Sequence, residues 1–510
     1  MKRLLLSLTT LAILWVAGCG SGGSTPVPPP PVGGFTNASL KGQYAFSMSG
    51  SEVATSGGLT SSFFARVGSF IADGNGNITG GVEDVNLANG TSNFLFTSGT
   101  YAIDPDGRGT LKLTNSTGTL EFSITLASTN NGFMVQMPPD GLSTTSGNFR
   151  KQDTSAFTLS GISGAYAFDF SGLNPSAAFE SIVGQFATNS NGVICSGQED
   201  DNDASLSAPV NTAITGTYAQ DPLFPSDMAN FGRGVATFGG VTYVFYIVDR
   251  TRVNFMETTT GGALLGSAVA QTNVLVNPSQ FNGGFVFVMG GIGGSGPITR
   301  GGRFTATGGN LSAILEDDNN AGSVTSQSAS TGTYTIDPAG SGRGTVTFAA
   351  GSAGTFTFIF YLTSPTQGFL QDQSPNVIAD GSLAGQSMGS ITNTSLAGNY
   401  AFNWSGIDST DVTTDEEDFV GQLNLASGSF TGTVDLNEFA SAKQFFNLPI
   451  NGTLALSADP TGHNSFTVTL QTNPSSKLTF FAYVANNNTI LLMGTQQNVR
   501  VITGVITPQQ

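Results

Sequence analysis

Large apolar side chains alternate with smaller ones at four places along the chain. The alternation begins at Tyr44, Tyr166, Phe285 and Tyr400, and two more large apolar residues follow each of them at every second position. A period of two puts alternate side chains on opposite faces of an extended strand, so each segment predicts a strand with one buried face. Helical spacing of apolar residues is nearly absent.

Each of these segments opens a longer repeat. A Gly-x-Phe/Leu motif, an acidic run, a Gly-Thr-Tyr/Leu motif and a closing Gly-x4-Gln follow in the same order, and the copies start 115 to 122 residues apart. This period exceeds that of common solenoid and propeller units, so each copy is predicted to be a domain with its own core. The closing glutamines are Gln152, Gln271, Gln386 and Gln509.

Turn residues divide the first repeat into short strands. Asp73-Gly74 and Asn75-Gly76 mark one hairpin, and residues 104–109 mark a second. About eight antiparallel strands result, with every link short except the first. A meander of this kind predicts a closed barrel because closure removes exposed edges, and a two-sheet sandwich is the alternative.

The predicted fold class is therefore all-β, with four tandem antiparallel domains of about eight strands each. A signal peptide and a tether precede the domains. The predicted parts are a signal peptide at 1–18, a tether at 19–36, and β domains at 37–153, 157–272, 278–388 and 391–510.

The repeats resemble the lipocalin and avidin group of eight-stranded barrels, the calycins. The resemblance lies in Gly-x-Tyr at the start of the first strand, the long first loop and the meander that follows. Tyr44 and its counterparts stand where that family has Trp, and the closing glutamines stand where lipocalins have Arg. The resemblance implies a lumen that holds a small apolar ligand. The alternative is that the Phe and Tyr side chains fill the barrel.

The N-terminus indicates export. Two basic residues precede an apolar stretch at 4–17, which is too short for a confident membrane span. The tetrapeptide that ends in Cys19 resembles a bacterial lipobox, which implies a lipid on the Cys19 sulfur and cleavage just before it. An ordinary signal peptide with an incidental cysteine is the alternative. Gly20 after the cysteine favours the outer membrane by the same resemblance, and residues 20–34 form a Gly/Ser/Pro-rich tether.

The net charge and the cysteine content limit the classes of partner and the covalent links that are expected. The formal charge is −17 with only 17 Lys and Arg and no basic run, which excludes a nucleic-acid footprint. The same charge disfavours electrostatic binding to anionic lipid, so the predicted membrane partner acts through the anchor alone. With Cys19 lipidated, Cys195 has no partner and no disulfide framework is expected.

The acidic runs are the first candidates for chemistry. They lie at 83–86, 199–202, 316–319 and 435–438. Clustered carboxylates and amides suit calcium, but a solvated loop is the preferred interpretation, and no metal ligand or cofactor is predicted.

The hairpin arginines are the second candidates. Arg108, Arg233 and Arg343 sit in Gly-Arg-Gly turns, and the fourth repeat has His463 at that position. Exposed pairing with a nearby Asp explains them without a ligand. A single histidine disfavours a Ser-His-Asp hydrolase, and zinc is likewise unsupported. A pair of glycosidase carboxylates stays open, although four equivalent domains disfavour a single catalytic cleft.

Two functions follow as hypotheses. In the first, the chain is a non-catalytic, lipid-anchored envelope lipoprotein whose domains serve binding, adhesion or structure, with repetition supplying reach and avidity. Its variable first loops at 51–67, 173–183, 291–301 and 407–420 would carry the contacts. In the second, each barrel carries a small hydrophobic ligand. A glycan-active extracytoplasmic protein is a remote third. The predicted location is the bacterial cell envelope, at the outer membrane and facing either side.

Overall fold

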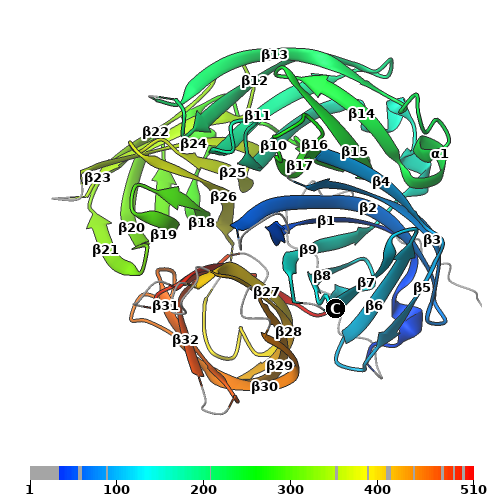
Figure 1. Ribbon diagram of the computed structural model, residues 1–510. Helices are drawn as coiled ribbons and strands as arrows, with labels where there is room; N and C mark the ends of the chain where they lie inside the picture. The colour runs from blue at the N-terminus through cyan, green and yellow to red at the C-terminus, as the bar shows by residue number, and fades with distance from the viewer. Residues whose placement is uncertain are drawn as a thin grey trace, which may run out of the picture.

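The structure is an all-β arrangement of four closed antiparallel barrels, one for each sequence repeat (Figure 1). The prediction of the fold class is confirmed, and of its two alternatives the structure shows closed barrels, not two-sheet sandwiches. The computed structural model describes residues 34–54, 60–87, 90–139, 141–206, 208–350, 354–387, 390–408, 415–439, 443–472, 476–485, 489–496 and 500–510.

Barrels 1 and 3 each contain one interrupted strand. In barrel 1 two short strands, β4 and β5, pair with successive parts of β3, and β2 pairs with β3 to close the sheet. Barrel 1 contains β1 (Lys41–Ala54), β2 (Thr60–Asp73), β3 (Asn77–Leu87), β4 (Gly90–Phe96), β5 (Ser98–Ile103), β6 (Arg108–Asn115), β7 (Gly118–Ser128), β8 (Asn131–Gln136) and β9 (Ser143–Lys151). Barrel 3 contains β18 (Gly283–Gly293), β19 (Gly296–Thr307), β20 (Asn310–Asn320), β21 (Ser323–Ala329), β22 (Gly332–Ile336), β23 (Arg343–Ala349), β24 (Thr355–Ser364), β25 (Gln367–Asp372) and β26 (Val377–Gln386).

Barrels 2 and 4 are uninterrupted meanders in which each strand pairs with the next and the last pairs with the first. Barrel 2 contains β10 (Gly164–Leu173), β11 (Phe179–Thr188), β12 (Val193–Asp203), β13 (Val210–Ala219), β14 (Arg233–Phe238), β15 (Val241–Asp249), β16 (Arg252–Glu257) and β17 (Leu265–Ala270). Barrel 4 contains β27 (Gly398–Asp408), β28 (Asp415–Ala426), β29 (Ser429–Glu438), β30 (Lys443–Ala455), β31 (Asn464–Leu470), β32 (Ser476–Val484), β33 (Ile490–Gly494) and β34 (Arg500–Pro508).

Helices are short and lie outside the strands. None in the described part of the chain has the length and apolar character needed to cross a membrane. They are the 3₁₀ helices η1 (Asn37–Ser39), η2 (Thr154–Ala156), η3 (Leu159–Ile162) and η4 (Pro278–Gln280), and the α-helix α1 (Asp227–Phe231).

Aromatic side chains fill the barrels. Tyr44, Phe46 and Met48 of the first strand are at most 1% exposed and face the core of barrel 1. In barrel 2, a void beside Tyr166 and Phe255 measures only 10 Å³, about the space of one water. Buried aromatic and aliphatic side chains form the described cores of all four barrels, which favours the filled barrel over the ligand-sized lumen implied by the calycin resemblance.

The glycine of each Gly-x-Phe/Leu motif makes this packing possible. Gly68 pairs with Phe46 across β1 and β2, and a Cβ on Gly68 would lie 2.5 Å from the ring Cζ of Phe46. The same crossing recurs in every barrel, at 2.4 to 2.8 Å. The other pairs are Gly184 with Phe168, Gly302 with Phe287, and Gly421 with Phe402.

The four barrels pack side by side into a closed ring (Figure 1). Each barrel presents the outer face of its first two strands to the sixth, seventh and eighth strand positions of the next barrel, and barrel 4 meets barrel 1 in the same way. Small apolar clusters lie at all four junctions. Repeated head-to-tail contacts of one kind close into a ring when the rotation fits. The domains are therefore not independent modules on a string.

Candidate functional site

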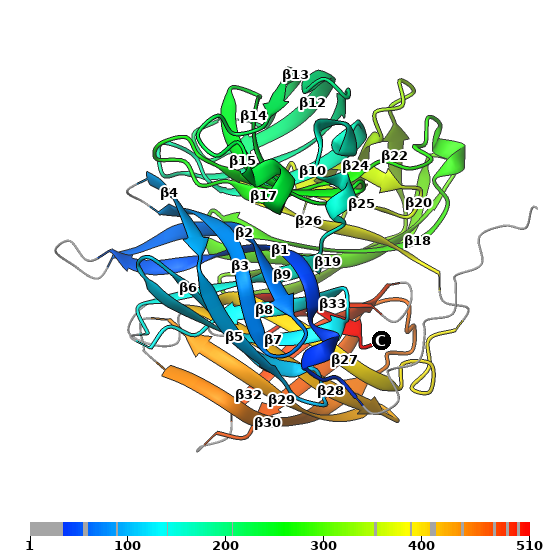
Figure 2. The same ribbon diagram turned by 90° about the vertical axis from the view of Figure 1, so that its right-hand side faces the viewer.

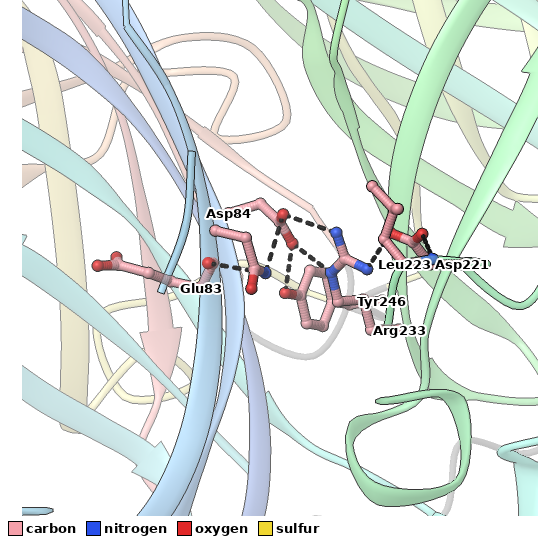
Figure 3. Close-up of polar contacts among 7 residues, drawn as sticks. Glu83, Asp84, Asp221, Leu223, Arg233 and Tyr246 are labelled. Carbon is pink, nitrogen blue, oxygen red and sulfur yellow. Dashed lines mark hydrogen bonds and ion pairs between the residues drawn. The ribbon is translucent and has the colours of Figure 1, made fainter. Parts of the chain in front are cut away.

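The acidic runs form the junctions of the ring, so their interpretation as solvated loops is wrong. Asp84 lies in β3 on the outer face of barrel 1 and is 2% exposed. Its carboxylate accepts from Arg233 of barrel 2 at 2.7 and 2.8 Å and from the Tyr246 hydroxyl at 2.6 Å (Figure 3). Arg233 also pairs with Asp221 at 2.5 Å. A buried guanidinium between two carboxylates joins the barrels.

The same kind of clamp recurs at two further junctions. At each of these three junctions the second residue of an acidic run meets the hairpin cation of the following barrel, and His463 takes the place of arginine as the alignment predicts. The recurring contacts are Asp200 with Arg343 and Tyr361, and Asp317 with His463 and Tyr483. At the fourth junction Asp435 accepts from the Asn447 N–H at 2.6 Å, and the charge of Arg108 acts on it without a direct ion pair.

The predicted pairing of hairpin arginines with a nearby Asp is only part of what the structure shows. Arg108 pairs with Asp106 in its own turn at 2.9 Å. Arg233 pairs with Asp221 of its own repeat and also with Asp84 one repeat earlier, and Arg343 pairs with Asp200 one repeat earlier. A sequence signal existed, since every acidic run is followed one repeat later by a hairpin cation, with the fourth run returning to the first repeat. Local turn chemistry could not reveal it.

Two amides in each repeat complete the junctions. The asparagine of each acidic run donates both side-chain hydrogens to backbone carbonyls of the next barrel at 2.7 to 3.0 Å. The closing glutamine does the same at 2.6 to 3.0 Å. Because Asn437 and Gln509 bind barrel 1, these contacts also close the ring. The asparagines are Asn86, Asn202, Asn319 and Asn437.

Metal binding finds no support at these runs. Within the described ranges, no group of three or more His, Cys, Asp or Glu side chains is placed to hold a metal ion. Cys195 is a free, exposed thiol on β12. The predicted lipidation site, Cys19, lies outside the described residues.

A cavity of 310 Å³ lies where the four barrels meet. It is lined by Ser49, Ser171, Gly290 and Ser405, which occupy the same position in the first strand of each barrel. The ends of the first hairpins of barrels 2, 3 and 4 frame it. Each of the four predicted contact loops therefore contributes to one site, with barrel 1 supplying Phe63 of loop 51–67 in addition to Ser49. We call this site the axial cavity.

The axial cavity combines apolar walls with protonated carboxyls. Phe179 and Ile298 supply apolar surface, and Asp380 and Glu180 supply carboxyls. Burial raises the pKa of Asp380 and of its neighbour Asp169, and the charge of Asp380 raises the pKa of Asp169 further. Burial, followed by repulsion from Asp201 and other acids, raises the pKa of Glu180 to about 8. The cavity therefore presents hydrogen-bond donors and acceptors with little negative charge.

Because the pKa of Glu180 is raised in the folded ring, we expect the ring to lose stability as the pH becomes alkaline. The folded Glu180 keeps its proton between its ordinary pKa and about 8, whereas the unfolded chain releases it. Stability from this group is fully present below the ordinary pKa and falls as pH rises through about 8. The thermal unfolding midpoint should therefore drop between about pH 5 and about pH 9, and Glu180→Gln should make the drop smaller. An unchanged pH profile in that variant would contradict the assignment.

The first hairpins point away from the start of the described chain. Lys41 at the start of β1 pairs with Asp73, while Ala54 and Thr60 form the last pair at the far end of these two strands. In Figure 2 the hairpin end of β1 and β2 lies on the left and the C-terminus on the right. The axial cavity therefore faces away from the end at which Gly34 enters barrel 1.

Comparisons with known proteins do not extend these observations. No family model matches the chain, and no curated protein matches it. Among solved structures, transferrin binding protein B from serogroup B Neisseria meningitidis is 9% identical, with 76% of this chain and 82% of that chain covered and a TM-score of 0.20. The Haemophilus parasuis Hp5 protein, a double mutant, is also 9% identical, with 74% and 82% covered and a TM-score of 0.17. CghA is 9% identical, with 96% of both chains covered and a TM-score of 0.16. At such scores no argument rests on these likenesses, and the interpretation of the site rests on its own geometry.

Proposed function

We propose that this chain is a lipid-anchored protein of the bacterial cell envelope, at the outer membrane, and that its ring of barrels is a rigid, non-catalytic binding platform. The convergence of the first hairpins around the axial cavity is the observation that supports this best. Rigid scaffolds commonly present their contacts on loops gathered at one end. The sequence predicts an array whose repeats supply reach. Because the barrels pack into a ring, we propose instead that they form one binding surface together.

The side chains that could suggest catalysis have structural roles at the junctions, which supports a non-catalytic function. His463 is the only histidine of the chain. Its ring stacks on Phe481 with centroids 4.1 Å apart, and its Nδ1 lies 2.9 Å from Asp317 at a junction. The acidic runs and hairpin arginines are likewise committed to junctions. The partner we propose is a protein or a glycan, held by the hairpin surface.

The anchor has a direct test. Cys19→Ala should remove radiolabelled palmitate from the protein and release it from the membrane fraction, because the lipid is the proposed attachment. Cys195→Ala is the matched control, since it removes the other cysteine and should leave labelling and fractionation unchanged. Membrane association that survives in Cys19→Ala would rule the anchor out.

The binding surface has a separate test within one barrel. Phe179 lies at the axial cavity and is 42% exposed, and Leu223 is 80% exposed between β13 and β14, at the opposite end. A photo-crosslinking residue at position 179 should give a discrete adduct on cells that express the protein. The same residue at position 223 should not. Equal adducts at both positions, or none at position 179, would contradict the proposed surface.

A further inference from the structure

A second groove, at the junction of barrels 1 and 2, departs from the rest of the ring. It has a volume of 670 Å³ and lies at the ends of β9, β15 and β16, on the side where Gly34 enters barrel 1. Its charged lining consists of Arg150, Lys151 and Arg252 with Asp153 and Asp249. Three cations in one groove are notable in a chain whose formal charge is −17. We call this site the arginine groove.

The two arginines of this groove lack the carboxylates that other arginines have. Among the described residues, neither Arg150 nor Arg252 has an ion pair, and the buried Nε of Arg150 has no hydrogen-bond partner. Arg252 donates only to the Ser267 hydroxyl, at 2.9 Å. The exposed Arg250 donates to the backbone oxygen of Ser155, and other arginines of the ring are paired with carboxylates: Arg66, Arg233, Arg300, Arg343 and Arg500.

The two acids of the groove are already engaged by their own turns. One oxygen of Asp249 accepts from the backbone N–H and the hydroxyl of Thr251, both at 2.6 Å. Asp153 caps η2 by accepting from the Ser155 N–H at 3.0 Å. Neither acid reaches ion-pair distance of Arg150 or Arg252 in the described structure. The charge of Asp249 favours the charged form of both arginines, but no carboxylate of the described structure forms an ion pair with either guanidinium group.

Neither arginine follows from the repeat. Arg150 pairs with Ala45, the residue that follows Tyr44 in β1. The equivalent pairing position holds Val269 in barrel 2, Ala384 in barrel 3 and Thr507 in barrel 4. The position of Arg252 holds Asn131 in barrel 1 and Gln367 in barrel 3. The framework of the ring therefore does not require these cations. Arg150 and Arg252 both line the groove at the junction of barrels 1 and 2.

Without a counter-ion, the arrangement is unfavourable. Burial lowers the pKa of Arg150, and burial together with repulsion from Arg150 lowers the pKa of Arg252 to about 9. Removing water from two like charges raises the free energy of the protein unless an anion neutralises them. Guanidinium forks bind phosphate oxygens in pairs of parallel hydrogen bonds, with a geometry that lysine cannot reproduce.

We propose that the arginine groove binds a phosphate group, carried by a small molecule or a lipid headgroup, between the guanidinium groups of Arg150 and Arg252. The groove lies on the side of the ring where the tether begins, opposite the axial cavity. This site is independent of the proposed hairpin surface. A failure here would leave that surface untouched.

The test uses the ring, residues 34–510, which contains every strand of the structure. Inorganic phosphate should raise the thermal unfolding midpoint of the unaltered ring. Arg150→Val and Arg252→Gln introduce residues found at the same positions in barrels 2 and 3. Each should weaken phosphate binding roughly tenfold or more in calorimetry, because a charge-assisted pair of hydrogen bonds is lost. Lys112→Gln, which removes an exposed charge outside the groove, should bind phosphate as the unaltered ring does.

A second readout does not depend on binding. In phosphate-free buffer, Arg252→Gln should unfold at a higher temperature than the unaltered ring, because it removes a repulsive buried cation. The proposal is overturned if phosphate does not bind, or if both arginine variants bind it as the unaltered ring does. Vesicles of phosphatidylglycerol and of phosphatidylcholine identify the source. Retention on phosphatidylglycerol that Arg252→Gln abolishes indicates a headgroup, and binding of inorganic phosphate alone indicates a small molecule.

Discussion

Replacing Asp84 with alanine is expected to lower the free energy of unfolding by about 3 to 5 kcal/mol. Asp84 is 2% exposed and is the partner of both Arg233 and Tyr246 across the first junction. The substitution leaves a buried guanidinium with Asp221 alone and a buried hydroxyl without its acceptor. Urea denaturation followed by circular dichroism measures the loss, with limited proteolysis to show whether barrels 1 and 2 separate.

The matched control is an ion pair at the surface of the same barrel. Glu121 pairs with Lys112 at 2.8 Å, and both side chains are more than a third exposed. Glu121→Ala should cost less than about 1 kcal/mol because exposed pairs gain little. Removing Arg233 and Asp221 together with Asp84 should recover part of the loss, since none of the three charges of the clamp then remains. If Asp84→Ala costs no more than Glu121→Ala, the junction is not held by this clamp.

The second large effect is expected from a methyl group added to Gly68. A Cβ at this position would lie 2.5 Å from the Phe46 ring and 2.5 Å from the backbone oxygen of Val82. The ring is held in a packed core and the carbonyl belongs to the sheet, so neither can move away easily. Gly68→Ala should therefore destabilise barrel 1 by about 3 kcal/mol.

Gly80 on the neighbouring strand provides the control. It also lies inside a strand, but an added Cβ there would meet nothing within 4 Å. Gly80→Ala should change stability by less than about 1 kcal/mol. Thermal melts of the two variants, followed by circular dichroism, decide the matter. Similar midpoints for both would show that the close approach of Gly68 to Phe46 is not important for the packing.

The features that were predicted correctly depend on neighbours along the chain. Alternation at Tyr44, Phe46 and Met48 marks the first strand, and Asp73-Gly74 marks a hairpin turn between the next two strands, because side-chain direction and backbone conformation are set within a few residues. The structure places the turn there, between β2 and β3. The predicted alternative of barrels filled by Phe and Tyr is correct as well.

The features that were missed depend on residues one repeat away. Asp84 was interpreted as part of a solvated loop, yet its partner Arg233 lies 149 residues further along the chain. The arginine groove was not predicted either, since Arg150 and Arg252 become neighbours only when barrel 1 packs on barrel 2. Burial and pairing of this kind follow from how the domains pack, and the local pattern is the same whether a face meets water or another barrel.

The sequence by itself determined four repeats, their strands, their turns and the aromatic cores, because short-range periodicity dictates which side chains share a face. Only the tertiary structure decided that the barrels close into a ring, that the acidic runs are junctions and that the first hairpins surround one cavity. The physical reason is that the sequence pattern of an outer strand face is the same whether that face meets solvent or another barrel. Its carboxylates and amides acquire their roles when a second barrel removes them from water and supplies the hydrogen bonds that water made before.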